Sequence, residues 1–523
     1  MICTSSVFRP LTACPRLLPL CLASILACIG SVAAAELLPR PEAIVLPEEK
    51  PALDEMNAAL LERKPPSLEA ALRQFDSLLV RTARPTKLRG LVQYFRAGLL
   101  EEMKRNSAAR EAIDESIRLL PDYSGPLLLG SAIYAYDDLP GEAADLLIRA
   151  SRLDPAIVAK IQEYEINNIL SRLDGQRDRR RAGLLSARSL EIGWLGGSLD
   201  ARSRLAFRAI DARMEAGDLS GAKSLVPKLL SPGHSRSLLV DRKYEPLWAD
   251  IERWAGPQLQ EQWLVYLRES RAKWQASKDH ESALAYARAL RSAGHHRTLI
   301  REMSPLFDRQ IDRARDYDLV FMAALLADAL AREGRWADIT SLFNKAAAVW
   351  PLGSDANALN IAANRARFLL YEGKAAEGLA AMDAALADAR DRGGEVNSDA
   401  LAAMQQVRAC LLHELGRAEG AVISQAFASA ARPVELAALL LCLNKPEAAR
   451  DVLLAAAADE NAREEVIQYM QDSDAVPMQS DYGRRIHERH AALRADPQLR
   501  AAVGRHGRFL PFSIRAGAPP ESD

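Results

Sequence analysis

The sequence predicts an all-α solenoid built from helix–turn–helix repeats. In the stretch "GEAADLLIRASRLDP", Ala143, Leu147 and Ala150 lie on one stripe of a helix. Pro155 ends that helix, because proline has no N–H to donate and its ring clashes with the preceding turn. The same skeleton recurs 34 residues upstream, in "NSAAREAIDESIRLLP", which ends at Pro121. Alternating strand patterns are almost absent, so the helical class does not depend on any one repeat.

Two consecutive units in a 34-residue register resemble the tetratricopeptide repeat (TPR) family. The positions that carry the resemblance are Ala97, Leu100, Ala109, Ile113, Ser116 and Pro121 in the first unit, and Ser131, Tyr134, Ala143, Leu147, Ala150 and Pro155 in the second. The resemblance implies a right-handed superhelical array. The sequence at 156–310, whose centre is broken by Pro and Gly, predicts an irregular central part. The resemblance also implies that the first helices line a concave groove, which binds a protein or peptide.

The first 35 residues are expected to be a secretory signal peptide. Arg9 and Arg16 precede the apolar run "LLPLCLASILACIGSV", and the small residues Ala33, Ala34 and Ala35 follow it. An uncleaved anchor is one alternative, and lipid attachment at Cys28 is another. The prediction is therefore a periplasmic or secreted protein. A retained anchor would support a third option, a structural spacer tethered near the membrane.

The mature chain is expected to contain two regular arrays separated by a less regular region. Residues 36–52 are rich in Pro and Glu, which predicts an extended arm. The expected segments after the arm are an N-terminal array at 53–155, an irregular helical region at 156–310, a C-terminal array at 311–470, and a C-terminal helix with a frayed tail at 471–523. In the later part, the turn glycines Gly334, Gly373 and Gly416 are 39 and 43 residues apart, which is longer than the family's unit.

Charge and cysteine content restrict the possible partners. Without residues 1–35, the 68 basic residues become 66 against 69 acidic ones, so the net charge moves from −1 to −3. This near-neutral balance argues against nucleic-acid binding through bulk charge. Cys410 and Cys442 remain after the leader is removed. Both lie in apolar helical stretches, which favours buried free thiols, with a disulfide in an oxidising compartment as the alternative.

A polar stripe is the most specific binding prediction. Asn357, Asn360, Asn364 and Arg367 follow helical spacing in "SDANALNIAANRARFLLYEG", on a helix whose other face is apolar. In the TPR family such first helices face the groove, where amides and guanidinium groups can hold a peptide backbone or carboxylate. We therefore expect Asn360, Asn364 and Arg367 to contact the partner. An ordinary solvated helix face is the alternative interpretation.

A cluster of tryptophans supports a second hypothesis. Trp248, Trp254, Trp263 and Trp274 fall within 27 residues. Core packing is the favoured interpretation, but Trp248 and Trp263 are also candidate binding residues for a sugar or for a partner's side chain. A carbohydrate-binding protein or glycan-active enzyme is then the alternative function, with Glu245, Asp250 or Glu261 as its carboxylates.

No catalytic, cofactor or metal motif is evident, so the first expectation is a non-enzymatic scaffold without a cofactor. The histidines of "HERH", His487 and His490, are three residues apart instead of the four found in metalloproteases. His295 and His296 are expected to be solvated at a turn. By analogy with exported repeat proteins, the expected setting is outer-membrane assembly, secretion or polysaccharide export.

Overall fold

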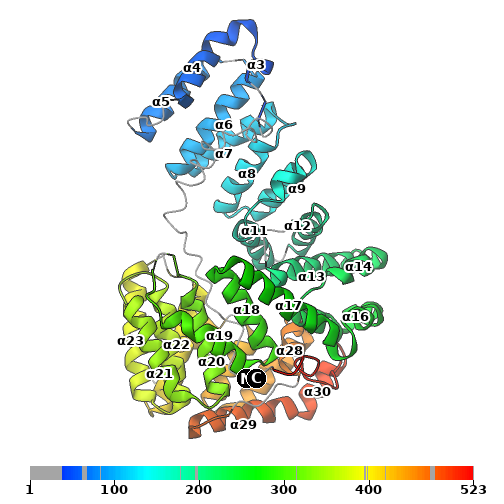
Figure 1. Ribbon diagram of the computed structural model, residues 1–523, viewed down its shortest axis with the longest axis vertical. Coiled ribbons are helices and arrows are strands. Elements are labelled where there is room, and N and C mark those ends of the chain that lie inside the picture. Colours follow the sequence, from blue (N-terminus) through cyan, green and yellow to red (C-terminus); the bar gives the residue numbers. More distant parts are fainter. Residues whose placement is uncertain are drawn as a thin grey trace. The chain divides into compact units, whose positions relative to one another are not determined.

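The computed structural model describes residues 38–521, apart from 40, 62–66, 83, 177, 195–197, 314, 394–395, 397, 418–419, 431 and 472–476. The expected signal peptide at 1–35 lies outside these residues. The described chain is helical, and its one β-bridge joins Asp241 to Gly507 (Figure 1). The chain divides into two compact units, which are treated separately below. Among the described residues, the N-terminal unit comprises 38–194 and Ala201–Lys228, and the C-terminal unit comprises Ser198–Asp200 and 229–521.

The N-terminal unit is a series of antiparallel helical hairpins. Its helices are α3 (Pro41–Ile44), η1 (Pro47–Glu49), α4 (Lys50–Leu61), α5 (Leu68–Arg81), α6 (Lys87–Glu102), α7 (Asn106–Leu119), α8 (Ser124–Tyr136), α9 (Pro140–Leu153), α10 (Pro155–Val158), α11 (Glu163–Gly175), α12 (Arg179–Glu191), α13 (Leu199–Glu215, from Ala201 onward), α14 (Leu219–Leu225) and η2 (Val226–Lys228). From α4 to α9, each helix packs on the next one in the chain.

Small residues hold these hairpins together, as the repeat pattern predicts. Ala97, Ala109, Ala143 and Ala150 have no exposed surface. The hydroxyl of Ser131 donates to the carbonyl of Ala143 at 2.9 Å, so α8 and α9 touch at the predicted crossing point. Ser116 bonds the carbonyl of Gly90 at 2.8 Å in the same way between α7 and α6. The all-α helical-repeat fold is confirmed.

Residues 36–52, expected to be an extended arm, begin the helical array where they are described. The Glu49 carboxylate explains this difference: it is buried, and it accepts hydrogen bonds from the Leu46 amide at 3.0 Å and from the Thr86 hydroxyl at 2.5 Å. Ala52, at the start of α4, is also buried. The side-chain contact between Glu49 and Thr86, the residue before α6, thus helps to fold a segment whose composition alone suggests an extended chain.

The C-terminal unit continues the hairpin pattern. Its helices are α15 (Pro232–Val240), η3 (Arg242–Leu247), α16 (Trp248–Ala255), η4 (Pro257–Leu259), α17 (Gln260–Ser277), α18 (His280–Ala293), α19 (His296–Met303), η5 (Ser304–Phe307), α20 (Leu319–Arg332), α21 (Trp336–Val349), α22 (Ala358–Glu372), α23 (Ala375–Arg392), α24 (Ser398–Glu414), α25 (Gly420–Ser429), α26 (Pro433–Cys442), α27 (Pro446–Ala458), α28 (Arg463–Tyr469), α29 (Asp481–Ala495) and α30 (Pro497–Gly504). Gly294, Gly334, Gly373 and Gly416 end first helices with positive φ, which glycine adopts without steric cost.

The array in the C-terminal unit returns upon itself. α15 packs against α28, and the Gln468 amide donates to the carbonyl of Ser237. In addition, α29 crosses the ends of three earlier helices: it packs on α22, α26 and α27, and it lies along the lower edge of the unit in Figure 1. The last part of the chain therefore lies against helices that are distant in sequence.

Candidate peptide-binding groove

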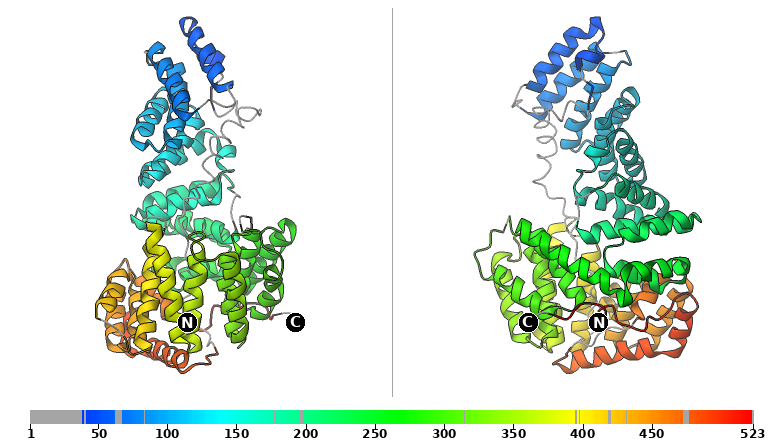
Figure 2. Two further views of the ribbon diagram at one scale, coloured as in Figure 1. Left: turned by 90° about the vertical axis from the view of Figure 1, so that its left-hand side faces the viewer. Right: turned by 45° about the vertical axis from the view of Figure 1, so that its right-hand side comes forward.

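The last described residues of the chain, 505–521 (here the tail), run along the helices α15 to α19 (Figure 2, right). The tail was expected to fray, but it makes backbone and side-chain hydrogen bonds from one end to the other. It begins with the one β-bridge of the described residues. The Arg242 amide donates to the carbonyl of His506 at 2.9 Å, and the Arg508 amide donates to the carbonyl of Val240 at 2.8 Å.

Arg508 anchors the start of the tail. Its guanidinium lies 3.8 Å from the centre of the Trp248 ring, and it donates to the carbonyl of Leu239 at 2.6 Å and to Glu252 at 2.7 Å. Stacking on an indole and pairing with a carboxylate are the two contacts that suit a planar guanidinium best. The Trp248 N–H is used elsewhere, because it donates to the carbonyl of Leu238 at 2.9 Å.

Trp263 holds the middle of the tail. Its ring is 1% exposed, and its Nε1–H donates to the carbonyl of Ile514 at 2.9 Å. A side-chain donor that binds a backbone carbonyl fixes the path of a peptide without reading its side chains.

A close backbone contact follows three residues later, at Gly517. A Cβ on Gly517 would lie 2.1 Å from the carbonyl oxygen of Gln258, so only glycine fits there. Gln258 and Leu259 both have positive φ, 53° and 66°, which non-glycine residues rarely adopt. Strained backbone of this kind gathers at binding sites. Here it forms the wall against which the tail packs.

The turn between α18 and α19 binds the end of the tail. Arg515 lies against Gly294 and donates to the carbonyls of Arg291 and Ser292, at the C-terminal end of α18. A cation at a helix C-terminus is stabilised by the exposed carbonyls and the helix dipole. His295 Nε2 donates to the carbonyl of Pro519 at 2.7 Å.

Glu521 completes the contact at the N-terminal end of α19. Its carboxylate accepts a hydrogen bond from the Thr298 amide and lies 3.6 Å from Arg297 Nε. A carboxylate satisfies the free amides of a first helical turn and opposes the positive end of the helix dipole. We call the residues of α15–α19 that contact the tail the tail groove. It provides donors for backbone carbonyls, acceptors for an arginine and an amide for an acid.

Both tryptophans singled out in the sequence lie in this groove, Trp248 under Arg508 and Trp263 under Ile514. The other two lie outside it: Trp254 donates to the carbonyl of Leu229, and Trp274 stacks on Tyr286 at 5.5 Å. The candidate glycan-enzyme carboxylates Glu245 and Asp250 each form an ion pair with an arginine of their own turn.

The predicted polar stripe on α22 does not join this site. Asn360 and Asn364 are 6% and 8% exposed, and the side-chain amide of Asn364 donates to the backbone carbonyl of Asn360 at 2.8 Å. The guanidinium of Arg367 lies 5.3 Å from the centre of the Phe368 ring. The structure thus places both asparagines in the interior of the C-terminal unit.

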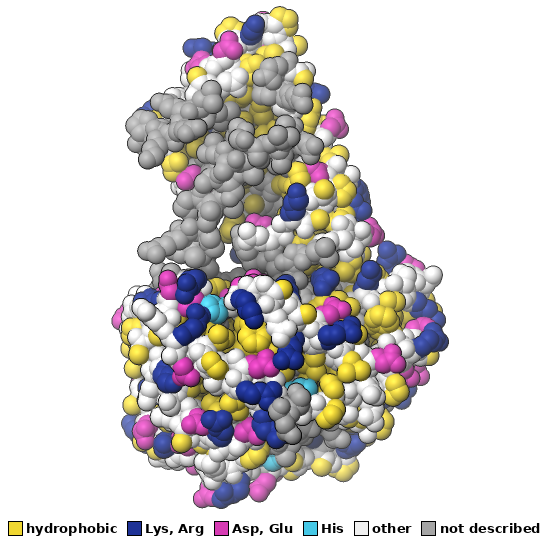
Figure 3. Space-filling model, viewed as in Figure 1, with side chains coloured by type: hydrophobic (Ala, Val, Ile, Leu, Met, Phe, Trp, Pro, Cys, Tyr) yellow, Lys and Arg dark blue, Asp and Glu magenta, His cyan; other side chains and the backbone are white. Residues whose placement is uncertain are grey.

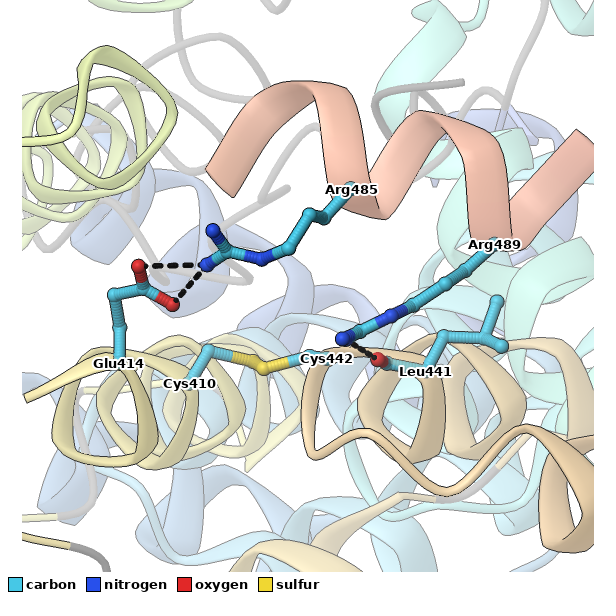
Figure 4. Close-up of a disulfide and its surroundings, with 6 residues drawn as sticks. All are labelled: Cys410, Glu414, Leu441, Cys442, Arg485 and Arg489. Carbon is cyan, nitrogen blue, oxygen red and sulfur yellow. Dashed lines mark hydrogen bonds and ion pairs between the residues drawn. A yellow bond between two sulfur atoms is a disulfide. The ribbon is translucent and has the colours of Figure 1, made fainter. Parts of the chain in front are cut away.

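The two remaining cysteines form a disulfide, Cys410–Cys442, so the favoured prediction of free thiols is wrong. It ties α24 to α26 beneath α29 (Figure 4). From α29, Arg485 pairs with Glu414 at 2.8 Å, and Arg489 donates to the carbonyl of Leu441 at 2.8 Å. Two sequence-distant helices carry the cysteines to the same place, and no feature of either apolar stretch signals this pairing.

Of the two histidines of "HERH", His490 has a structural role. His490 is 3% exposed and hydrogen-bonded to the hydroxyl of Tyr469 at 2.8 Å, and burial lowers its pKa to about 3. Within the described ranges, no three His, Cys, Asp or Glu side chains converge to hold a metal ion.

Basic and acidic side chains are interspersed over the face of the C-terminal unit seen in Figure 3. None of the helices in the described part of the chain combines the length and the apolar character that crossing a bilayer requires.

Sequence reasoning missed most of the groove. His295 was expected to be solvated, yet it bonds the tail, and the neighbouring His296 is 7% exposed. Gly517 and Glu521 lie in a Pro- and Gly-rich stretch that is typical of a frayed end. The one sequence signal for the groove is the cluster of tryptophans. The tail carries arginines for which the sequence predicts no other role.

No protein-family model matches the chain, and a comparison with curated proteins finds no match. Among solved structures, the chain is similar to the crystal structure of yeast Tom70, with a TM-score of 0.30 and 14% identity over 87% of this chain and 98% of that one. It is similar to a structure of Naa15/Naa10 bound to HypK-THB, with a TM-score of 0.25 and 13% identity over 90% and 77% of the chains. It is also similar to the P58(IPK) TPR domain, with a TM-score of 0.20 and 14% identity over 71% and 99%. These TM-scores are low, and no function is assigned to this chain from the similarity.

Proposed function

We propose that this protein is an exported, non-enzymatic helical-repeat scaffold, whose C-terminal unit binds a segment of a protein partner. One observation carries the proposal: the tail groove already binds a peptide, the chain's own tail. Trp263 and His295 donate to backbone carbonyls of that peptide, on either side of a turn at Ile514–Gly517. Donors of this kind can bind any peptide whose backbone follows the same turned path.

The proposed compartment is the periplasm or the extracellular space. The basic and apolar leader supports export. The disulfide between Cys410 and Cys442 supports it independently, because such bonds persist in oxidising compartments and are rare in the cytosol. We place the partner among proteins of outer-membrane assembly, secretion or polysaccharide export, by analogy with exported repeat proteins alone.

Crosslinking in intact cells tests the binding function. A photo-crosslinking residue is placed at Leu264 or Arg297, which are exposed in the C-terminal unit, and at Val80, which is 78% exposed in the N-terminal unit, as the matched control. We expect one defined protein to be captured from position 264 or 297 and not from 80. Absence of any captured protein at both C-terminal positions would refute the proposal.

Alkylation tests the compartment. We expect Cys410 and Cys442 to resist alkylation in the denatured, unreduced chain taken from cells, and to react after reduction. A variant without residues 1–35 serves as the control, because the chain then stays in a reducing compartment and its thiols should react directly. Thiols that react equally in both chains would exclude export.

A further inference from the structure

We propose that the tail is an internal competitor, and that the groove recognises partner segments that share its chemistry: an arginine, a glycine two residues later, and a carboxylate four residues after the glycine. This inference rests on the proposed function and specifies its ligand. The three elements correspond to Arg515, Gly517 and Glu521, which make the side-chain and steric contacts that an unrelated peptide would lack.

Each element of the motif meets a different requirement of the groove. The arginine fills the carbonyl end of α18, the glycine passes the Gln258 carbonyl, and the acid meets the first turn of α19. Between them the side chains of Ala516 and Pro520 are exposed. The backbone is constrained, because the Ala516 and Ala518 amides donate to the carbonyls of Ser513 and Arg515 at 3.0 Å and form a turn. Specificity thus comes from opposite charges at fixed separation around one position that excludes a side chain.

The tail is bound in a way that permits release. Only Gly507, Leu510 and Gly517 of its 17 residues, 505–521, are buried. Hydrogen bonds at separate points hold the segment, and Leu510 is its one buried apolar side chain, with Phe509, Phe512 and Ile514 half-buried.

Tethering keeps the groove closed even if each contact is weak. A covalently linked segment acts at an effective concentration of about 1 mM. If the free groove binds such a peptide with a Kd of about 10 μM, its own tail fills it about 99% of the time, and the apparent affinity for a partner falls about 100-fold.

Displacing the tail should therefore raise the affinity for a free peptide. The probe is a fluorescent synthetic peptide of residues 505–521, and its binding is measured by anisotropy to the full chain and to Gly517→Val, whose side chain would collide with the Gln258 carbonyl. We expect the Gly517→Val chain to bind the peptide at least about tenfold more tightly than the wild type. The control variant is Ala516→Val, next to it and exposed, which should bind like the wild type.

Further arms separate the possible failures. The variant Arg515→Ala/Glu521→Ala provides a second route to an open groove. The melting temperatures of both variants are measured, to detect any change of fold. Peptides carrying Gly517→Val, or Arg515→Ala with Glu521→Gln, should lose binding to the opened chain by about tenfold or more.

Equal affinity of the wild-type and both opened chains for the peptide would overturn the inference, as would binding that ignores the peptide substitutions. A concentration-dependent dimer that disappears in Gly517→Val would also overturn it, because the occupant would then be a second copy of the chain. Capture of a partner in cells without any peptide effect leaves the scaffold function standing and removes only the motif. Loss of cellular capture with an intact peptide effect removes the scaffold function and leaves the groove chemistry.

Discussion

Trp263 and Ile514 are joined by a hydrogen bond of 2.9 Å, from the indole N–H to the backbone carbonyl, although 251 residues separate them in the chain. The bond is buried at the Trp263 end, so the indole would lose its partner if the tail left. An unsatisfied buried donor costs about 1–3 kcal/mol. Tail release therefore has a definite cost in this unit, which a bound partner peptide would offset.

Substituting Trp263 by phenylalanine tests this bond. The Trp263→Phe variant removes the N–H and leaves the Ile514 carbonyl without its donor, so we expect about 1–3 kcal/mol less tail stability. The measurement is the rate of trypsin cleavage after Arg508 and Arg515, followed by mass spectrometry. Trp274→Phe, outside the groove, is the control and should leave the rate unchanged. A similar rate for Trp263→Phe and wild type would show that the bond does not hold the tail.

The disulfide should stabilise the C-terminal unit. Closing a loop with a sequence separation of 32 between Cys410 and Cys442 is expected to add about 3–4 kcal/mol to the free energy of unfolding. Urea unfolding of the oxidised and reduced chains measures the difference. The Cys410→Ala/Cys442→Ala variant should match the reduced chain in both conditions, and an equal midpoint for oxidised and reduced wild type would contradict the prediction.

A glycine in the N-terminal unit tests the small-residue packing of the hairpins. A Cβ on Gly183 in α12 would lie 2.0 Å from the Cβ of Ala212 in α13. We expect Gly183→Ala to lower the free energy of unfolding by about 1–3 kcal/mol through overpacking. Gly175, at the end of α11, has no neighbour within 4 Å of such a Cβ, so Gly175→Ala is the matched control and should cost nothing. Thermal unfolding followed by circular dichroism distinguishes the two, and an unchanged midpoint for Gly183→Ala would count against close helix contact.

The repeat pattern predicts local structure well because both depend on the same spacing. Ala143 and Ala150 are buried, and Gly334 and Gly373 have positive φ, because a hairpin needs a small crossing point and a left-handed turn residue wherever it occurs. The tail groove is different. Its contacts join Trp263 to Ile514 and His295 to Pro519, more than 200 residues away in each case. The spacing of residues within a repeat cannot predict contacts between such distant positions.

Helical periodicity alone does not show whether a polar residue faces solvent or the interior. Asn360 and Asn364 follow helical spacing, which equally suits a solvated face and an inward one that other helices cover. In this chain α29 packs on α22 from a position far along the sequence. The two cysteines illustrate the same limit. Cys442 is buried and Cys410 half-buried, and neither apolar stretch indicates that the two sulfur atoms meet.

Two aspartates in the segment before α20 should respond to pH with opposite sign. Burial raises the pKa of Asp318 from 3.8 to about 6, with Glu281 and Asp279 adding to the rise and Arg288 opposing it. The native state then holds the Asp318 proton more tightly than the unfolded chain. The stability of the wild type therefore falls as pH rises from 3.8 through about 6. Asp318→Asn should be more stable than wild type above that range, and the difference should vanish below it.

Asp316, two residues earlier, is fully buried and carries the opposite shift. Burial would raise its pKa, but the Arg315 hydrogen bond at 2.9 Å, the Asp312 amide at 2.9 Å, His280 and Arg309 together lower it below 3.8. The ionised Asp316 carboxylate stabilises the native state. This stabilisation is present above the pKa that Asp316 has in the unfolded chain, and it is lost as pH falls through the lower pKa of the folded chain. Asp316→Asn should therefore destabilise the protein at neutral pH, and by less and less in acid. Urea unfolding of the two variants across pH 3–7 (roughly the range over which carboxylates titrate) measures both. Differences of the same sign at neutral pH would show that the two carboxylates do not have the environments described here.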